Sequence, residues 1–414
     1  MLLYELHEFK NAAMLPAHLW SEANGLFFNL MPLSDNLWGR FLSAGNEIVE
    51  RSTRVYIKPS FHIPDTIVIE NGKERVCFIE ESLTLEHPFC NLLQFKRMCA
   101  GHAIGNNHPN VLIVSPLSGH HATLLRDTVT ALVPDHNVWI TDWKDSRLIS
   151  LSEGPFALDD YAELLLIFFE YFKGNIHVIA VCQPVVPVIM AVSSLAINDS
   201  PYQPKTMTLM GGPIDARVNP GVVNKFALDH DIDWFERNIL ATIPHYYPGV
   251  GRHVCPGFIM LNGFMALNIE RHQDASFNLF KHLVQGDLES TETHKVFYDE
   301  YRSVMDVPAE YYMESITRIF QTFDLPRGKM TFHGEYIKPE SIKKTALLTI
   351  EGERDDISCP GQTYAAHNLC SSLGENKKEF YVQEHVGHYG IFNGKRWREI
   401  IKPKIAKFIR RFDD

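Results

Sequence analysis

Cys182 stands between a strand-like run and a helix-like run of apolar residues. His177–Val181 has the composition of a short buried strand, and Val185–Leu195 is long and apolar enough for a buried helix. A nucleophile in a sharp turn from strand to helix forms a nucleophile elbow, and here Ala180 and Pro184 hold the positions of the glycines in the usual G-x-S-x-G pattern. A helix N-terminus also stabilises a thiolate. The pattern predicts a cysteine nucleophile, although a lone cysteine is more often a core thiol.

Two later strand-like runs end in an acid and a histidine. KTALLTIEGERDD ends in Asp355 and Asp356, and KEFYVQEHVGHYG contains His385 and His388. The carboxyl ends of parallel strands meet at one edge of a sheet, so these groups are expected above Cys182. A base that activates the thiol and a carboxylate that orients the base complete a triad. We predict His388 as the base and Asp355 as the acid, with His385 and Asp356 as their rivals.

Two further acids also follow strand-like runs. Asp142 in TDW and Asp215 in GGPID could each serve as the orienting carboxylate. They rank below Asp355 because neither follows the long insertion that precedes the last two strands, and capping of the next helix is the commoner role for such acids.

The segment PLSGHHATLL begins where another strand-like run ends. Gly119 sits where backbone must approach a ligand closely. We expect the backbone N–H groups of Gln183 and Ser118 to stabilise an oxyanion, while a plain strand-to-helix turn is the simpler interpretation of SGHH. A metal at His120 and His121 is not expected, because adjacent residues do not converge on one ion.

The order of elements predicts an α/β protein with a mostly parallel sheet and helices on both faces. From residue 110 strand-like and helix-like runs alternate, which is typical of parallel sheets. We divide the chain into a helical segment at 1–60, a core formed by 61–217 and 339–414, and a helical cap at 218–338 in which no clear strand is expected.

Several local predictions accompany this division. Asn71-Gly72 indicates a hairpin between two strands. Residues 87–108, 362–373 and 396–412 are each expected to be helical.

Composition limits the classes of function. The 414 residues carry a net charge of −11, which argues against nucleic acid as a partner. Neither a signal peptide nor an apolar run of membrane-spanning length is visible. The seven cysteines are odd in number and lack CxxC spacing, which argues against a zinc site and fits reduced thiols in a cytoplasm.

The 218–338 segment is rich in large apolar residues. They would form the core of the cap or, where exposed, a receiving surface for an apolar substrate. The candidates are Trp234, Phe235, Tyr246, Tyr247, Phe258, Met260 and Phe264.

Motifs along the whole chain resemble those of intracellular poly(3-hydroxybutyrate) (PHB) depolymerases and, more distantly, polyhydroxyalkanoate synthases. They include LYELHEFKNAAMLPAHLW, SPLSGHHATLLRDT, HVIAVCQPVVPV, EGERDDIS and EHVGHYGIFNGKRWRE. The resemblance implies an α/β-hydrolase fold and a triad of Cys182, Asp355 and His388 that needs no metal or cofactor. It implies a cytoplasmic enzyme on polyester granules that releases 3-hydroxybutyrate and oligomers.

Two other functions stay open at this point. A synthase-like acyltransferase would use the same cysteine on a CoA thioester, although the synthase elbow typically has glycine after its cysteine, where this chain has Gln183. A granule-binding protein without catalysis is the other. The sequence fixes no polymer-contacting residue, and a homo-oligomer is left open.

Overall fold

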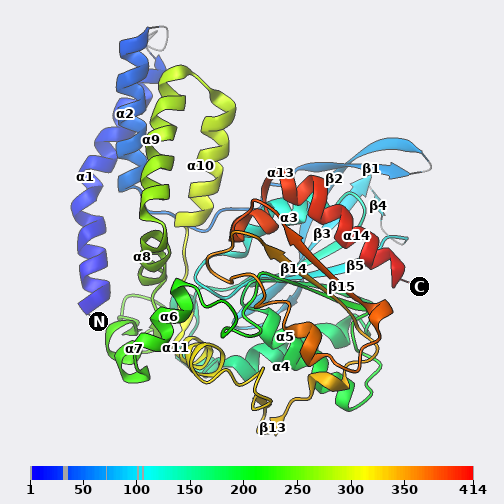
Figure 1. Ribbon diagram of the computed structural model, residues 1–414. Helices are drawn as coiled ribbons and strands as arrows, with labels where there is room; N and C mark the ends of the chain where they lie inside the picture. Colours follow the sequence, from blue (N-terminus) through cyan, green and yellow to red (C-terminus); the bar gives the residue numbers. More distant parts are fainter. Residues whose placement is uncertain (1, 31–35, 71, 100–101, 105–106, 414) are drawn as a thin grey trace.

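A central, mostly parallel sheet organises the molecule (Figure 1). The computed structural model describes residues 2–30, 36–70, 72–99, 102–104 and 107–413. Within these residues the sheet has ten strands in the order β1-β2-β3-β6-β5-β7-β8-β14-β15, with β4 paired to β3. Their bounds are β1 Asp65–Glu70, β2 Lys73–Glu86, β3 Cys90–Cys99, β4 His102–Ile104, β5 Asn110–Val114, β6 Asn137–Trp143, β7 His177–Val181, β8 Thr206–Met210, β14 Ala346–Gly352 and β15 Lys378–Gln383.

The six strands from β6 to β15 in this order run parallel, and β1, β2 and β3 extend the sheet in antiparallel fashion. Successive side chains of the parallel strands enter two different cores, one on each face. Helices α4 (Leu158–Tyr171) and α5 (Val185–Ile197) cover one face. Helices α3 (Arg126–Leu132) and α14 (Lys402–Arg411) cover the other. The predicted α/β class is confirmed.

One predicted helix is wrong. Residues 87–108 contain β3 and β4, and β3 pairs with β2 on one side and β6 on the other. Side chains of β3 alternate between buried and partly buried on either side of Leu92 and Leu93, which are both buried, and this interruption hides the period of two in the sequence. The predicted hairpin is confirmed by the pairing of Glu70 with Lys73, and Asn71 lies outside the described residues.

Two other predicted helices have mixed outcomes. Only α12 (Ala366–Leu369) forms within 362–373, and the rest of that stretch is turns. The C-terminal helix is present as α13 (Gly394–Arg396), a π-helical segment Trp397–Ile401 and then α14.

The segment 218–338 is mostly helical but not free of strands. Its helices are α6 Val222–Asp229, α7 Ile232–Asn238, α8 Gly257–Leu267, α9 Ile269–Gln285, α10 Leu288–Arg302 and α11 Ala309–Glu314. The short strands β9 (Ala241–Thr242), β10 (His253–Cys255) and β11 (Val307–Pro308) form a small antiparallel sheet, and β12 (Thr331–Phe332) pairs with β13 (Glu335–Tyr336). Strands of two or three residues are too short to show alternation in a sequence.

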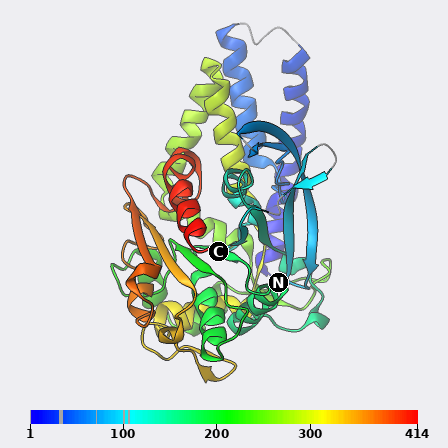
Figure 2. The ribbon, with the colours of Figure 1, turned by 90° about the vertical axis from the view of Figure 1, so that its right-hand side faces the viewer.

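Four helices from two distant parts of the chain form a column that we call the tower. Helix α1 (Leu2–Leu30) packs on α2 (Leu37–Thr53), α2 packs on α9, and α9 packs on α10. Figures 1 and 2 show the tower standing away from the sheet. The division of the chain at 60, 217 and 338 stays a proposal, since the tower joins helices of the 1–60 segment with helices of the 218–338 cap. Among the described residues, no helix is both long and apolar enough to cross a bilayer.

Cys77 and Cys99 form a disulfide between β2 and β3, so the expectation that all the cysteines are reduced thiols is not met. The two residues lie on paired strands, one position beyond the Phe78–Met98 pair, and share a small buried cluster with Val68. Sequence spacing alone does not reveal such a cross-strand pair.

Candidate active site

Cys182 occupies the turn between β7 and α5, as predicted for an elbow. Its φ is +70°, a left-handed conformation that non-glycine residues rarely adopt and that clusters at functional sites. The Cys182 N–H donates to the Met210 carbonyl at 2.7 Å, which ties the turn to the end of β8. Pro184 is the N-cap of α5, where a missing N–H costs no helical hydrogen bond.

Two glycines after β8 provide the space that the elbow requires. A Cβ on Gly212 would lie 2.3 Å from the Cys182 carbonyl oxygen and 2.2 Å from a methyl group of Val185. Gly211 has a φ of +55°, and its Cβ would lie 3.2 Å from Asp355 Oδ2. The elbow lacks its own glycines, so the neighbouring strand supplies the clearance. Sequence reasoning missed this role, although the pair of glycines at a strand end was a visible signal.

The structure brings Asp355, His388 and Cys182 together. Nδ1 of His388 donates to Asp355 Oδ2 at 2.7 Å, and His388 and Cys182 line the same cavity. Because Nδ1 is bonded to the carboxylate, Nε2 is the ring nitrogen that is available to the sulfur. Asp355 Oδ1 accepts the N–H groups of Ile357 and Ser358 at 3.0 and 2.9 Å, which fixes the carboxylate. Asp355 is 3% exposed and His388 5%.

The surroundings favour a protonated imidazole. Burial would by itself lower the pKa of His388, but the Asp355 carboxylate and the sulfur of Cys182 together raise this pKa well above its ordinary value. A protonated imidazole beside Cys182 can donate its proton to a leaving group.

The rival residues make other contacts. Asp356 is exposed and accepts a hydrogen bond from Asn268 at 2.6 Å. His385 is also exposed and lies 3.2 Å from Glu353. Asp142 binds Lys58 at 2.6 Å, and Asp215 binds Arg217 at 2.8 Å. None of the four pairs with His388 in the contacts of the described residues.

The two predicted oxyanion donors line the same cavity as Cys182. This cavity is about 490 Å³ and includes Ser118, Gln183 and His388 in its wall. In the described part of the chain, the backbone N–H groups of Ser118 and Gln183 donate to no other group. Gly119 has a φ of +98°, a conformation that strongly favours glycine, and the terminal methyl group of Met260 would lie 2.8 Å from a Cβ at this position.

His120 and His121 face different cavities and do not form a metal site. His120 lines the cavity at Cys182 and donates from Nε2 to the Tyr301 carbonyl at 3.0 Å. His121 lines a second cavity of about 1260 Å³, on the side of α1 and α2. Burial lowers the pKa of each histidine to about 4, so both are neutral at pH 7.

Helix α8 separates the two cavities. Met260 and Phe264 line the smaller one, whereas Phe258 lines the larger one. The remaining wall of the smaller cavity is mostly apolar and includes Val222, Phe226, Ile316 and Phe320. A helix that is apolar on every side is usually buried, but only Gly257 of α8 is fully buried.

The other aromatic candidates of the cap have different places. Phe235 is buried and Tyr246 is exposed, while Tyr247 donates a hydrogen bond to Glu8 of α1. Trp234 stacks edge-on against Phe226.

Comparison with known proteins points to one family. Residues 211–413, which include Asp355 and His388, match the family model described as PHB de-polymerase C-terminus. This part of the chain is therefore similar to the C-terminal domain of PHB depolymerases. The mostly parallel sheet and the tight strand-to-helix turn after β7 give the chain the α/β-hydrolase fold. No curated protein matches the chain significantly.

Among solved structures, a putative lipase from Acinetobacter baumannii is 13% identical, with 80% of this chain and 93% of that chain covered and a TM-score of 0.42. The 2-hydroxy-6-oxo-6-phenylhexa-2,4-dienoate hydrolase of Rhodococcus sp. strain RHA1 is 14% identical, with 81% and 99% covered and a TM-score of 0.44. A monoacylglycerol lipase from Paleococcus ferrophilus is 13% identical, with 74% and 96% covered and a TM-score of 0.42. Likenesses of this strength carry no argument about function.

Proposed function

We propose that the chain is a thiol-dependent depolymerase that hydrolyses poly(3-hydroxybutyrate) in amorphous cytoplasmic granules and releases 3-hydroxybutyrate and short oligomers. The observation that carries the proposal is that His388, hydrogen-bonded to Asp355, lines the same cavity as Cys182 at the turn between β7 and α5. The PHB depolymerase C-terminal domain supports the choice of polyester.

In the first step the sulfur of Cys182 attacks the ester carbonyl carbon. The carbonyl oxygen gains negative charge, and the free N–H groups of Gln183 and Ser118 donate to it. The tetrahedral intermediate collapses with cleavage of the carbon–oxygen bond. His388 protonates the departing alkoxide, which leaves as a hydroxyl chain end, and an acyl thioester stays on Cys182.

In the second step water replaces the alcohol. His388, now neutral, removes a proton from the water as it attacks the thioester carbonyl. The carbon–sulfur bond breaks and the carboxylic acid product leaves. His388 keeps the proton that it took from the water, so the thiolate of Cys182 and the protonated His388 are regenerated. Asp355 keeps the imidazole oriented and stabilises its positive charge throughout.

The cavity suits an uncharged aliphatic ester. Its wall is mostly apolar, and a polyester segment carries no ionic group whose hydration would be lost when the segment enters the cavity. The ester carbonyl is the polar group that must find donors, and the two N–H groups beside Cys182 are available for it.

A cysteine pair tests the proposal. Cys182→Ala should abolish release of 3-hydroxybutyrate from native granules, whereas Cys359→Ala should release it at the normal rate, since Cys359 is a free, partly exposed cysteine outside the triad. Mass spectrometry after brief exposure of the unsubstituted protein to substrate should find a hydroxyacyl adduct on Cys182. Undiminished release by Cys182→Ala would reject the proposed nucleophile.

A further inference from the structure

The outward face of α1 is apolar along its whole length. Positions 2, 6, 9, 13, 16, 20, 23 and 27 all carry apolar residues, and all are exposed. Their spacing alternates between four and three, so they form one stripe along the helix. Phe9 is 74% exposed and Trp20 64%. A helix of a soluble protein normally turns such a stripe toward the protein interior, whereas α1 turns its stripe toward solvent.

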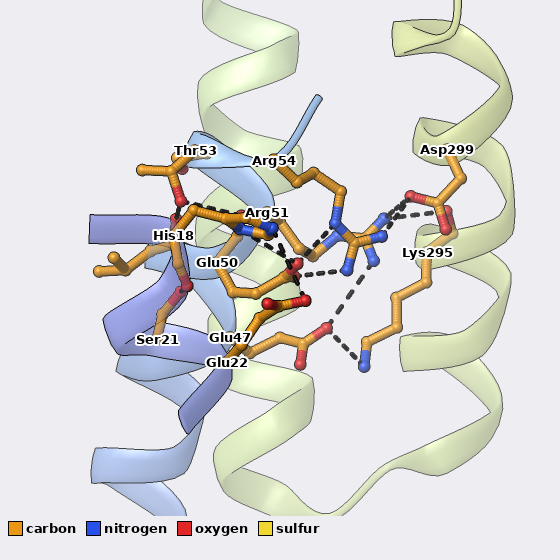
Figure 3. A network of polar contacts seen from close by, with 12 residues as sticks. His18, Ser21, Glu22, Glu47, Glu50, Arg51, Thr53, Arg54, Lys295 and Asp299 are labelled. Atoms are coloured by element: carbon orange, nitrogen blue, oxygen red, sulfur yellow. Dashed lines mark hydrogen bonds and ion pairs between the residues drawn. The ribbon is translucent and has the colours of Figure 1, made fainter. Parts of the chain in front are cut away.

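The inside of the tower is correspondingly polar. Figure 3 shows charged and hydroxyl side chains of α1, α2 and α10 pointing toward one another. Ser21 is fully buried, and its carbonyl accepts a hydrogen bond from Asn46 at 2.8 Å. Arg51 is 5% exposed, lies 2.5 Å from Asp299 and contacts Glu47 at 3.7 Å. The tower therefore has buried ion pairs inside and an apolar stripe on the outward face of α1.

A metal ion does not explain this network. His18, Glu22 and Glu50 place one ligand atom each within 4.8 Å of one another. However, both carboxylate oxygens of Glu50 already accept hydrogen bonds from Arg54, at 2.8 and 2.5 Å. An ion would have to displace this guanidinium, so the group is part of the ion-pair network.

The other tower helices also expose large apolar side chains. Helix α2 exposes Leu37, Trp38 and Leu42, helix α9 exposes Phe277, and helix α10 exposes Leu288. In Figures 1 and 2, α1 and α10 lie on opposite sides of the tower. A second copy that paired with the stripe of α1 would cover one side and leave the rest in water. An extended apolar phase can cover all of them.

The charges beside the α1 stripe favour an uncharged phase. The charged residues that the described part of α1 exposes are Glu5, Lys10 and Glu22, and the whole chain carries a net charge of −11. Helices that lie on anionic membranes carry several Lys and Arg residues beside their apolar face, whereas Lys10 is the one Lys or Arg among these exposed residues of α1. An aliphatic polyester has no such charge and imposes no repulsion.

We propose that the tower is the surface by which this protein docks on its solid, uncharged polyester, with the α1 stripe against or within the polymer. The inference rests on the proposed function for the identity of the polymer. It adds the segment that binds the polymer outside the catalytic cavity.

The tower is also continuous with the cavity wall. Asn268 ends α8 and begins α9, so the docking element and the helix that carries Met260 are adjacent in the chain. The Asn268 side chain in turn donates to Asp356, the neighbour of the triad carboxylate. Docking through the tower thus holds the polymer surface at the helix that bounds the cavity of Cys182.

A triple substitution of exposed residues tests this proposal. Phe9→Ser, Trp20→Ser and Phe27→Ser together remove the three aromatic side chains of the stripe, and because these side chains are exposed, their loss removes little packing from the fold. The matched control is Leu151→Ser, Ile167→Ser and Ile197→Ser on the hydrolase core, which are also exposed. Both variants are compared with the unsubstituted protein in sedimentation with protein-free amorphous PHB granules, in granule hydrolysis and in hydrolysis of soluble p-nitrophenyl butyrate.

The stripe variant should lose more than about tenfold in granule binding and granule hydrolysis, because each buried aromatic side chain contributes on the order of a tenfold factor in affinity. Its soluble-ester hydrolysis should equal that of the control. Granule binding by the stripe variant at the level of the control would overturn the proposal. A change from dimer to monomer in light scattering with unchanged granule binding would instead assign the stripe to a second copy. Binding to phosphatidylcholine vesicles but not to granules would assign it to lipid.

Failure of the proposed function is a separate result. Cys182→Ala should still sediment with granules although it hydrolyses nothing. If the unsubstituted protein sediments through its stripe but releases no hydroxyacid, the docking surface stands and the depolymerase proposal fails. If it hydrolyses the soluble ester but does not sediment, docking fails and the esterase site stands.

Discussion

The hydrolase core and the tower bury opposite kinds of side chain. In the core, alternate strand residues fill two apolar clusters, and the polar groups buried at the elbow are those of the proposed triad. In the tower, Arg51 and Ser21 are buried while Phe9 and Trp20 face outward. Buried polar groups therefore have two different places in one molecule. In the core they lie at the cavity that Cys182 lines, and in the tower they join helices whose large apolar side chains face solvent.

This difference predicts which substitutions affect activity and which affect stability. Changes at buried polar groups of the core should remove chemistry, whereas changes at buried polar groups of the tower should lower stability and leave soluble-ester hydrolysis intact. Four substitutions sharpen or break the comparison.

The largest effect is expected for Asp355→Asn. Loss of the carboxylate removes the orientation and charge stabilisation of His388, and the same change in a serine protease triad lowers kcat about 10⁴-fold. We expect a loss of this order with p-nitrophenyl butyrate. Asp356→Asn is the matched control and should keep normal turnover, since Asp356 contacts Asn268 and not His388. Equal losses in both variants would contradict the assignment of the acid.

The same variant has a pH signature. The folded protein raises the pKa of His388 above its ordinary value through Asp355 and Cys182, against the effect of burial. The resulting stability is complete below about pH 6.5, the ordinary histidine pKa, and is lost as the pH rises through the raised value. The difference in Tm between the unsubstituted protein and Asp355→Asn should therefore be largest at mildly acidic pH and shrink at alkaline pH.

Gly212→Ala should cost about 3 kcal/mol of unfolding free energy, because the new Cβ overlaps a backbone carbonyl and a valine methyl group in a packed core. Denaturant unfolding measures the cost, and activity should fall with it since the elbow must shift. Normal stability with normal activity would show that the elbow does not depend on this clearance.

Arg51→Met should lower the unfolding free energy by about 2–3 kcal/mol, near the lower end for a broken buried ion pair because Asp299 is partly exposed. Turnover of the soluble ester should not change. Arg410→Met removes an exposed pair with Asp135 and should cost under about 0.5 kcal/mol. If Arg51→Met instead removed activity at normal stability, the tower network would belong to the chemistry.

The smallest effect is expected for Gly263→Ala in α8, the helix between the two regions. A Cβ there meets no atom within 4 Å, and alanine in a helix is more favourable than glycine by about 0.5–1 kcal/mol. Tm should rise by roughly 1–2 °C. A rise in Tm accompanied by slower granule hydrolysis and normal soluble-ester hydrolysis would indicate that α8 moves when polymer enters.

The sequence was sufficient to predict where strands end, and this is why Cys182, Asp355 and His388 were found together. It also predicted that α1 is a helix. It could not predict which side of α1 faces inward, because apolar spacing gives the stripe but not its environment, and the usual rule would bury it. The strand β3 was missed for a related reason: its period of two depends on pairing with β2 and β6, which lie elsewhere in the chain.

The glycines beside the elbow have a consequence for protein engineering. Residues 180–184 cannot be exchanged as an independent loop, because the space for their turn depends on Gly212, in the loop that follows β8. Gly212 already provides the space that flanking glycines would add to a serine turn at this position. The turn at 180–184 and the loop after β8 would therefore need to be redesigned together. Exchange of the sulfur for an oxygen at position 182 alone leaves that unit intact, and is therefore the cleaner route to an enzyme with a different nucleophile.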